Sequence, residues 1–189
     1  MKTRFFFFQF MTVEEALIAR IKKPKFTEWH RHFVAHPEQI PDLVDLALGS
    51  KKPPLPAHAS WILIHIAKTD WTLLRSYEHA FIDHFLQSTN QSILRNLLVS
   101  LLEFPLRDYR ESDFLDSLIT HVKNEENKVA LRVYSLYKLT EFVQRYPEIK
   151  VEIDAVIELI QEHPMSPAMK VGIRNFETMC QKMLGKLNV

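Results

Sequence analysis

Two kinds of helical pattern alternate along this chain at a nearly regular spacing, and this repeat restricts the possible folds more than any other feature. Apolar helices are expected to begin near Trp29, Trp61, Arg95, Arg132 and Lys170, at intervals of 32, 34, 37 and 38 residues. Between them lie apolar stripes with the spacing of one helix face, and no stretch shows the alternation of a strand. A two-helix unit repeated at this period predicts an all-α solenoid, in which each helix pair packs on its neighbours.

The repeated segments also match in detail. SILRNLLVSLLEF from Ser92 and KVALRVYSLYKLTEF from Lys128 both place an arginine one turn into a first helix. HPEQIPDLVDLAL from His36 and YPEIKVEIDAVIELI from Tyr146 both set Pro-Glu at the first turn of a second helix, where the missing N–H of proline costs nothing and the carboxylate favours the dipole. The apolar stripes of the second helices are Leu43, Val44, Ala47 and Leu48; Leu74, Phe81, Ile82 and Phe85; Phe114, Leu115, Leu118, Ile119 and Val122; and Val156, Ile157 and Ile160.

Over roughly residues 26–187 this pattern resembles the HEAT/armadillo-like α-α superhelix. The resemblance implies about four helical pairs and a C-terminal capping helix, although the period is shorter than the usual HEAT length. A tetratricopeptide-like variant would fit the shorter period, but the Trp–Leu-Gly–Tyr pattern of that repeat is absent. An irregular helical bundle is the other alternative, and it gives no reason for both helix types to recur in register.

We expect two segments in the chain: a Phe-rich N-terminal arm, residues 1–11, and a single helical-repeat domain, residues 12–189. The arm, MKTRFFFFQFM, is too short to span a bilayer or to act as a secretion signal. Thr12 and Glu15 have the spacing of a capping box, so a helix should begin there. The arm is expected either to fold back as a cap on the helix of Ala16, Leu17 and Ile21, or to precede a native start at Met11.

The composition argues against several classes of protein. With only 3 glycines the chain lacks the Gly-rich loops of Rossmann folds and P-loops, and a net charge of +1 leaves no overall electrostatic footprint for nucleic acid. A single cysteine, Cys180, excludes an internal disulfide framework and a cysteine-based zinc site, so the cytoplasm is the expected compartment. Cys180 lies in an apolar helical pattern, where a buried and inert thiol is expected.

The segment HPMSPAMKVGIRNFETM, from His163, contains the closest approach to an enzyme motif. Its Ser-Pro-Ala-Met-Lys core resembles the signature loop of the fumarase, aspartase and adenylosuccinate lyase superfamily, and this resemblance implies a lyase as one alternative. Pro167 stands in place of the second serine of that signature, and Lys170 in place of its proline, which shifts the lysine register. Ser166 as N-cap and Pro167 at N1 predict instead the start of the last helix. The apolar stripe expected on that helix is Ala168, Gly172, Phe176, Met179, Met183 and Leu187.

The other candidates for chemistry are spacing matches alone. His32 and His36 are four residues apart, as are His79 and Asp83, but a metal site needs a third ligand and an open position. No GxSxG nucleophile elbow is present in the sequence. We therefore expect no catalytic residue, no metal and no cofactor.

Acidic residues dominate the polar positions of the second helices, which line the concave face in solenoids of this type. Basic residues gather near the start of the chain and along the first helices. This asymmetry predicts an acidic groove that attracts a basic peptide or protein, although solvated helix faces would give the same pattern. The predicted partner-binding residues are Asp42, Asp45, Arg75, His79, Asp83, Asp113, Asp116, Asp154 and Glu158.

The resemblance to HEAT-like folds also brings in a second class of function. HEAT-like alkylpurine DNA glycosylases hold DNA on a concave face with aromatic, acidic and arginine side chains, and Trp71, Arg75 and Asp83 offer those types here. An acidic groove would repel a phosphate backbone, so a non-enzymatic adaptor that binds a protein partner is the preferred hypothesis. Any self-association is expected at the C-terminal end, through the adaptable methionines Met169, Met179 and Met183.

Overall fold

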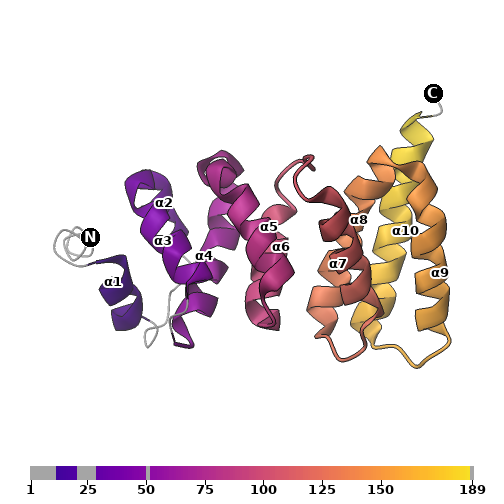
Figure 1. Ribbon diagram of the computed structural model, residues 1–189, viewed down its shortest axis with the longest axis horizontal. Coiled ribbons are helices and arrows are strands. Elements are labelled where there is room, and N and C mark those ends of the chain that lie inside the picture. Colours follow the sequence, from indigo (N-terminus) through magenta and orange to yellow (C-terminus); the bar gives the residue numbers. More distant parts are fainter. Residues whose placement is uncertain (1–11, 21–28, 50–51, 188–189) are drawn as a thin grey trace.

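The computed structural model describes residues 12–20, 29–49 and 52–187, which form an elongated array of helices (Figure 1). The described residues contain no strand. The 3-10 segments within these described ranges are η3 to η5, which lie among the α-helices. In chain order the elements are α1 (Val13–Arg20), α2 (Trp29–Ala35), η3 (Pro37–Gln39), α3 (Ile40–Leu48), α4 (Leu55–Asp70), η4 (Trp71–Tyr77), α5 (Glu78–Gln87), α6 (Gln91–Leu101), α7 (Glu111–Lys123), α8 (Val129–Arg145), η5 (Pro147–Ile149), α9 (Lys150–Gln161) and α10 (Pro167–Leu187).

The helices form two rows, and each repeat contributes one helix to each row. One row runs through α2, α4, α6, α8 and α10, each packed on the next, and the other includes α5, α7 and α9 in the same order. In chain order the pairs are α2 with α3, α4 with η4 and α5, α6 with α7, and α8 with α9, followed by α10, which packs on α8 at the C-terminal end (Figure 1). Contacts between the two rows join α3 to α4, α5 to α6 and α7 to α8. This arrangement confirms the predicted solenoid of four pairs and a closing helix.

A continuous core runs along the array between the two rows. Successive repeats are joined by aromatic contacts: the ring centroids of Phe81 and Phe104 are 6.3 Å apart, those of Phe85 and Phe114 5.4 Å, and those of Phe114 and Phe142 6.2 Å. Such edge-to-face and tilted ring pairs contribute stability beyond the burial of their apolar surface. Each repeat is thus held mainly by its neighbours in the chain, as expected of a solenoid.

Capping residues fix several helix starts at the predicted positions. The backbone N–H of Thr12 donates to Glu15 Oε2 at 2.9 Å and that of Glu15 donates to Thr12 Oγ1 at 3.2 Å, which is a complete capping box at α1. Ser166 Oγ accepts a hydrogen bond from the backbone N–H of Met169 at 3.2 Å, and Pro167 is the first residue of α10. The prediction that the Ser-Pro-Ala-Met-Lys segment begins a helix is therefore confirmed.

Some boundaries differ from the prediction. The helix expected near Trp61 begins six residues earlier, at Leu55. The two Pro-Glu pairs form the short 3-10 turns η3 and η5, which lead into α3 and α9, instead of belonging to the first α-helical turn. The phenylalanines of the arm and Ile21, predicted to pack together, lie outside the described residues.

The apolar stripe predicted for α10 is only partly correct, because Gly172 and Phe176 of that stripe are buried but Ala168 is not. The buried residues of the helix are Met169, Gly172, Ile173, Phe176 and Cys180, whereas Ala168 is exposed. The cause is that α10 packs closely on α8, so its buried surface is broader than one narrow stripe and includes Ile173. Met179 and Met183 are half-buried, and the side chain of Leu187 lies outside the described part. Met169 is only 1% exposed, so the prediction that it is available for self-association is wrong.

Candidate interaction face

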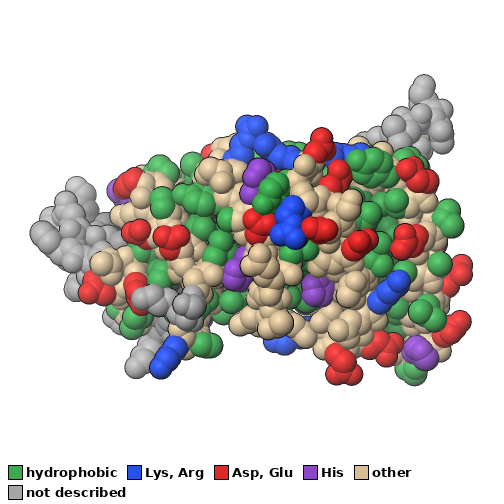
Figure 2. All heavy atoms as spheres, viewed as in Figure 1, with side chains coloured by type: hydrophobic (Ala, Val, Ile, Leu, Met, Phe, Trp, Pro, Cys, Tyr) green, Lys and Arg blue, Asp and Glu red, His purple; other side chains and the backbone are tan. Residues whose placement is uncertain are grey.

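The nine predicted site residues all lie in the row of helices formed by α3, η4, α5, α7 and α9. Asp83 and Asp154 are half-buried, and the other seven are exposed. Figure 2 shows Asp and Glu side chains spread across this face over α3, α5, α7 and α9. We refer to the carboxylates among the nine as the acidic row: Asp42, Asp45, Asp83, Asp113, Asp116, Asp154 and Glu158.

Two residues that the sequence analysis missed, Tyr109 and Arg110, bring three of the predicted ones together. The hydroxyl of Tyr109 donates to Asp83 Oδ2 at 2.7 Å, and Arg110 Nη1 donates to Asp83 Oδ1 at 2.9 Å. Arg110 also donates to Asp113 Oδ2, from Nη2 at 2.8 Å and from Nε at 3.0 Å. The ring of His79 stacks on Tyr109 with centroids 3.7 Å apart and an interplanar angle of 10°.

Two features distinguish this cluster, namely the shifted pKa values of Asp83 and Tyr109 and the left-handed backbone of Arg110. The hydrogen bonds from Tyr109 and then Arg110 hold the pKa of Asp83 below its usual value, while the hydrogen bond to Asp83 raises the pKa of Tyr109. Arg110 adopts a left-handed backbone conformation with φ of 45°. Among the described residues it is the non-glycine residue with a positive φ. This conformation carries a steric cost for an L-residue, which its two carboxylate partners help to offset.

Asp83 and Asp113 of the acidic row are therefore neutralised within the chain, and so is Asp154. Lys150 Nζ donates to both carboxylate oxygens of Asp154, at 2.8 and 2.6 Å, one turn along α9. Within the described part of the chain, no ion pair involves Asp42, Asp45, Asp116 or Glu158. These four exposed carboxylates, on α3, α7 and α9, are the ones free to meet a cation from outside.

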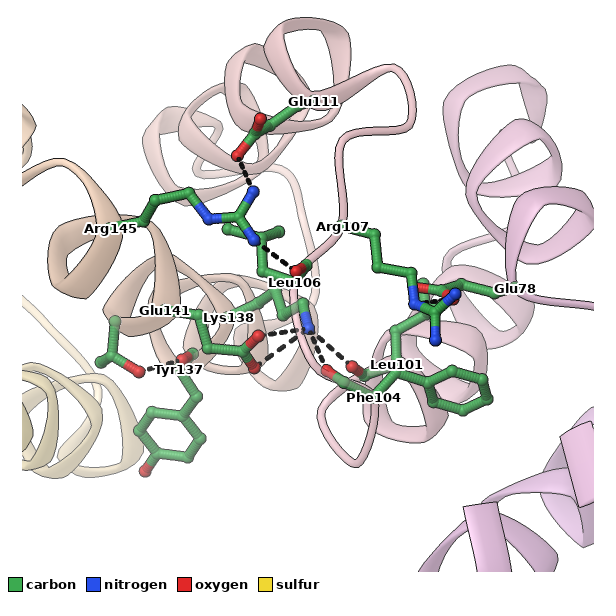
Figure 3. Close-up of polar contacts among 11 residues, drawn as sticks. Glu78, Leu101, Phe104, Leu106, Arg107, Glu111, Tyr137, Lys138, Glu141 and Arg145 are labelled. Carbon is green, nitrogen blue, oxygen red and sulfur yellow. Dashed lines mark hydrogen bonds and ion pairs between the residues drawn. The ribbon is translucent and has the colours of Figure 1, made fainter. Parts of the chain in front are cut away.

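A buried cation fixes the loop that carries Tyr109 and Arg110 (Figure 3). Lys138 of α8, only 2% exposed, donates to the backbone oxygens of Leu101 at 2.7 Å and Phe104 at 2.9 Å. Its Nζ also lies 2.8 and 3.0 Å from the two carboxylate oxygens of Glu141. Burial lowers the pKa of Lys138 and raises that of Glu141, and the attraction between the two opposes both changes. Lys138 thereby adds a charged donor to two carbonyls at and just beyond the end of α6, one of which, that of Leu101, also accepts from the backbone N–H of Phe104 at 3.2 Å.

Two arginines, Arg107 and Arg145, form ion pairs that hold the same loop from opposite sides. Arg107 Nε lies 3.1 Å from Oε2 of Glu78, whose side chain is almost fully buried at the start of α5. Arg145, near the end of α8, contacts Asp108 at 2.6 Å and Glu111 at 3.1 Å, and it donates to the backbone oxygen of Leu106 (Figure 3). The loop between α6 and α7 is thus fixed by residues of α5 and α8.

The remaining candidates for chemistry have structural roles. His32 is buried with its Nε2 2.9 Å from Gln39 Oε1, while His36 is exposed and 3.2 Å from Glu38. No group of three or more metal-binding side chains occurs among the described residues. Cys180 is fully buried, and burial raises its pKa to about 11, as an inert thiol requires.

Trp71, the aromatic residue of the glycosylase comparison, is half-buried and packs on Phe104 with centroids 5.5 Å apart. Asp70 caps the turn that begins there, accepting from the backbone N–H of Thr72 at 3.0 Å. Asp83 is already bonded to Tyr109 and Arg110. Trp71 is therefore engaged in packing and Asp83 in an ion pair, while Arg75 is exposed.

No described helix combines the length and apolar character needed to cross a bilayer.

Comparison with known protein families agrees with the architecture. No curated protein and no solved structure matches the chain. The HEAT repeat domain family, however, matches residues 13–179, which include all of the helical pairs and most of α10. This match and the two-row array of helices agree, and the chain belongs to the HEAT repeat domain family.

Proposed function

We propose that this chain is a non-enzymatic adaptor that binds a basic segment of a protein partner along the acidic row. The observation that supports this most directly is the set of exposed carboxylates without an ion pair in the described structure, Asp42, Asp45, Asp116 and Glu158. Helical-repeat proteins present extended surfaces of this kind to their partners. Carboxylates that meet no internal cation keep their full attraction for an external one.

The geometry of the repeat suggests the form of the partner. Neighbouring helices in one row are about 10 Å apart, and a peptide in the polyproline II conformation rises about 3.1 Å per residue with about three residues per turn. A basic residue at about every third position would therefore lie on one side of the peptide and meet successive helices of the row. Each exposed pair contributes only about 0–1 kcal/mol, so recognition depends on several pairs together and weakens with salt.

A binding assay with matched variants tests this proposal. Fluorescence anisotropy would compare a labelled peptide carrying lysine at every third position with an acidic peptide of the same length. The test variant combines Asp42→Asn, Asp45→Asn, Asp116→Asn and Glu158→Gln, and should lose most of the binding. The control combines Glu→Gln at four other exposed positions, Glu103, Glu125, Glu126 and Glu177, and changes the net charge equally. Equal binding by the two variants would show that the acidic row is not the site.

Two other functions considered from the sequence have less support. An acidic row opposes the approach of a phosphate backbone, and a gel shift at low salt should accordingly show no retarded band. Ser166, the serine of the lyase-like segment, caps α10 through the backbone N–H of Met169. A fumarate-release assay with adenylosuccinate should therefore give no turnover that depends on this hydroxyl.

A further inference from the structure

The C-terminal end of the solenoid carries exposed apolar side chains in a regular pattern. On α9, Val151 is 76% exposed and Leu159 is 54% exposed. Ala155, also exposed, lies between them at the i, i+4, i+8 spacing of one helix face. The opposite face of the same helix is buried through Ile153, Val156, Ile157 and Ile160. We call Val151, Ala155 and Leu159 the α9 stripe. The helices α9 and α10 together form the C-terminal end of the array in Figure 1.

The charges around this stripe have opposite signs on the two helices. On α9 and its C-cap, Glu152, Glu158 and Glu162 are exposed beside the stripe. On α10, Lys170, Arg174 and Lys182 are exposed, and Glu177 is the acidic residue among them. Within the described structure none of these residues forms an ion pair with another. The end of the array is thus an acidic, apolar helix beside a basic one.

We propose that this end docks a second copy of the same chain, with α9 of each copy against α10 of its partner. A partner of uniform charge would be attracted by one of the two helices and repelled by the other. A two-fold axis places the acidic helix of each copy opposite the basic helix of the other, so both contacts are favourable. The same docking removes the α9 stripe from water, which accounts for its exposure in a single chain.

This interface lies on a different surface from the one expected from the methionines. Met169 is buried within the chain, so the apolar contacts come from α9 instead. Glu158 borders both this interface and the acidic row, but the substitutions that test the dimer, at Leu159, Glu152, Glu162, Lys170 and Arg174, are not the ones varied in the peptide assay, so the two proposals can fail separately.

Sedimentation velocity over a range of concentrations tests the apolar part. The wild-type chain should show a reversible monomer–dimer equilibrium. Leu159→Glu should weaken it about tenfold, as expected for the loss of one apolar anchor. Ile18→Glu is the matched control, because Ile18 is also 54% exposed but lies on α1 at the other end. A wild-type chain that stays monomeric at its highest soluble concentration, or equal weakening by both substitutions, would overturn the proposal.

Charge reversal tests which helices meet. One variant carries Glu152→Lys and Glu162→Lys on the α9 side, and the other carries Lys170→Glu and Arg174→Glu on α10. Each alone should be monomeric, because like charges then face each other in both contacts. An equimolar mixture should form a heterodimer, since both of its contacts join opposite charges. An α10 variant that still dimerises alone, or a mixture that stays monomeric, would show that α9 does not face α10 of the partner.

Discussion

Adding one methyl group at Gly172 should destabilise the chain, because α10 approaches α8 closely there. A Cβ at this position would lie 2.6 Å from Cγ2 and 3.0 Å from Cγ1 of Val133. The Cβ of Val133 itself would lie 3.3 Å away, so rotation about χ1 cannot move both methyl groups out of the way. Valine in a helix is also restricted to one preferred rotamer. The helices would have to separate, or Val133 would have to adopt a strained conformation.

The net effect is the difference between two opposing terms. Overpacking of this kind costs about 1–3 kcal/mol. Replacing a helical glycine by alanine gains about 0.5–1 kcal/mol from backbone propensity. We therefore expect Gly172→Ala to lower the free energy of unfolding by about 1 kcal/mol, which corresponds to about 2–4 °C in Tm for a chain of this length.

Thermal and urea unfolding followed by circular dichroism would measure this effect. Gly185→Ala in the same helix is the control, because a Cβ there meets no described atom within 4 Å, and it should be stabilising. Adding Val133→Ala to Gly172→Ala should remove the clash, so the alanine at 172 should then be neutral or favourable. If Gly172→Ala alone is as stable as the wild type, the close contact between α8 and α10 does not limit the packing.

Three further predictions concern the polar clusters and two partly buried histidines. Lys138→Met should cost about 3–5 kcal/mol in urea unfolding, because it leaves the carboxylate of Glu141 without its cation and removes a charged donor from the carbonyls of Leu101 and Phe104, and a loss below 1 kcal/mol would contradict this role. Arg110→Gly should be more stable than Arg110→Ala by about 1 kcal/mol, since only glycine accepts a positive φ without steric cost, and equal stability would show that no strain is present. Burial lowers the pKa of His84 and of His121 below 6.5, so the unfolded chain binds protons there that the folded chain does not, and stability should fall as the pH falls below 6.5. The loss in urea midpoint between about pH 7.5 and about pH 5.5 should be smaller in His84→Gln/His121→Gln, and an unchanged loss would assign it to other groups.

The architecture could be predicted because its signals are local. Apolar spacing reports directly which side of a helix is buried, and Ser166-Pro167 encodes the start of α10 within two residues. The register of the α10 stripe could not be read in the same way. Ala168 and Met169 are both apolar, and only the position of α8 decides which of them is buried.

The exposure of the candidate interaction residues could be predicted in part for a related reason. Helical spacing places Asp42, Asp116 and Glu158 on the exposed sides of their helices, as the structure shows. The Arg110 contact with Asp83, however, joins residues 27 positions apart through an irregular loop, and no sequence pattern encodes such a contact. The sequence does indicate that Lys138 is buried, because it lies seven residues after Leu131 and therefore on the same, buried face of α8.

The anchored loop between α6 and α7 also has a consequence for cooperativity. In a solenoid whose repeats touch only their neighbours, unfolding can begin at either end and proceed one repeat at a time. Here Glu78 of the second pair, Arg107 in the loop of the third, and Lys138 and Arg145 of the fourth are tied to one short segment. These three pairs should therefore open as a single unit in hydrogen exchange, while α1 and the first pair exchange earlier. The ion pairs and hydrogen bonds to this loop join the second, third and fourth helix pairs into one cooperative unit of unfolding. Unfolding of any one of these pairs therefore removes contacts that stabilise the other two.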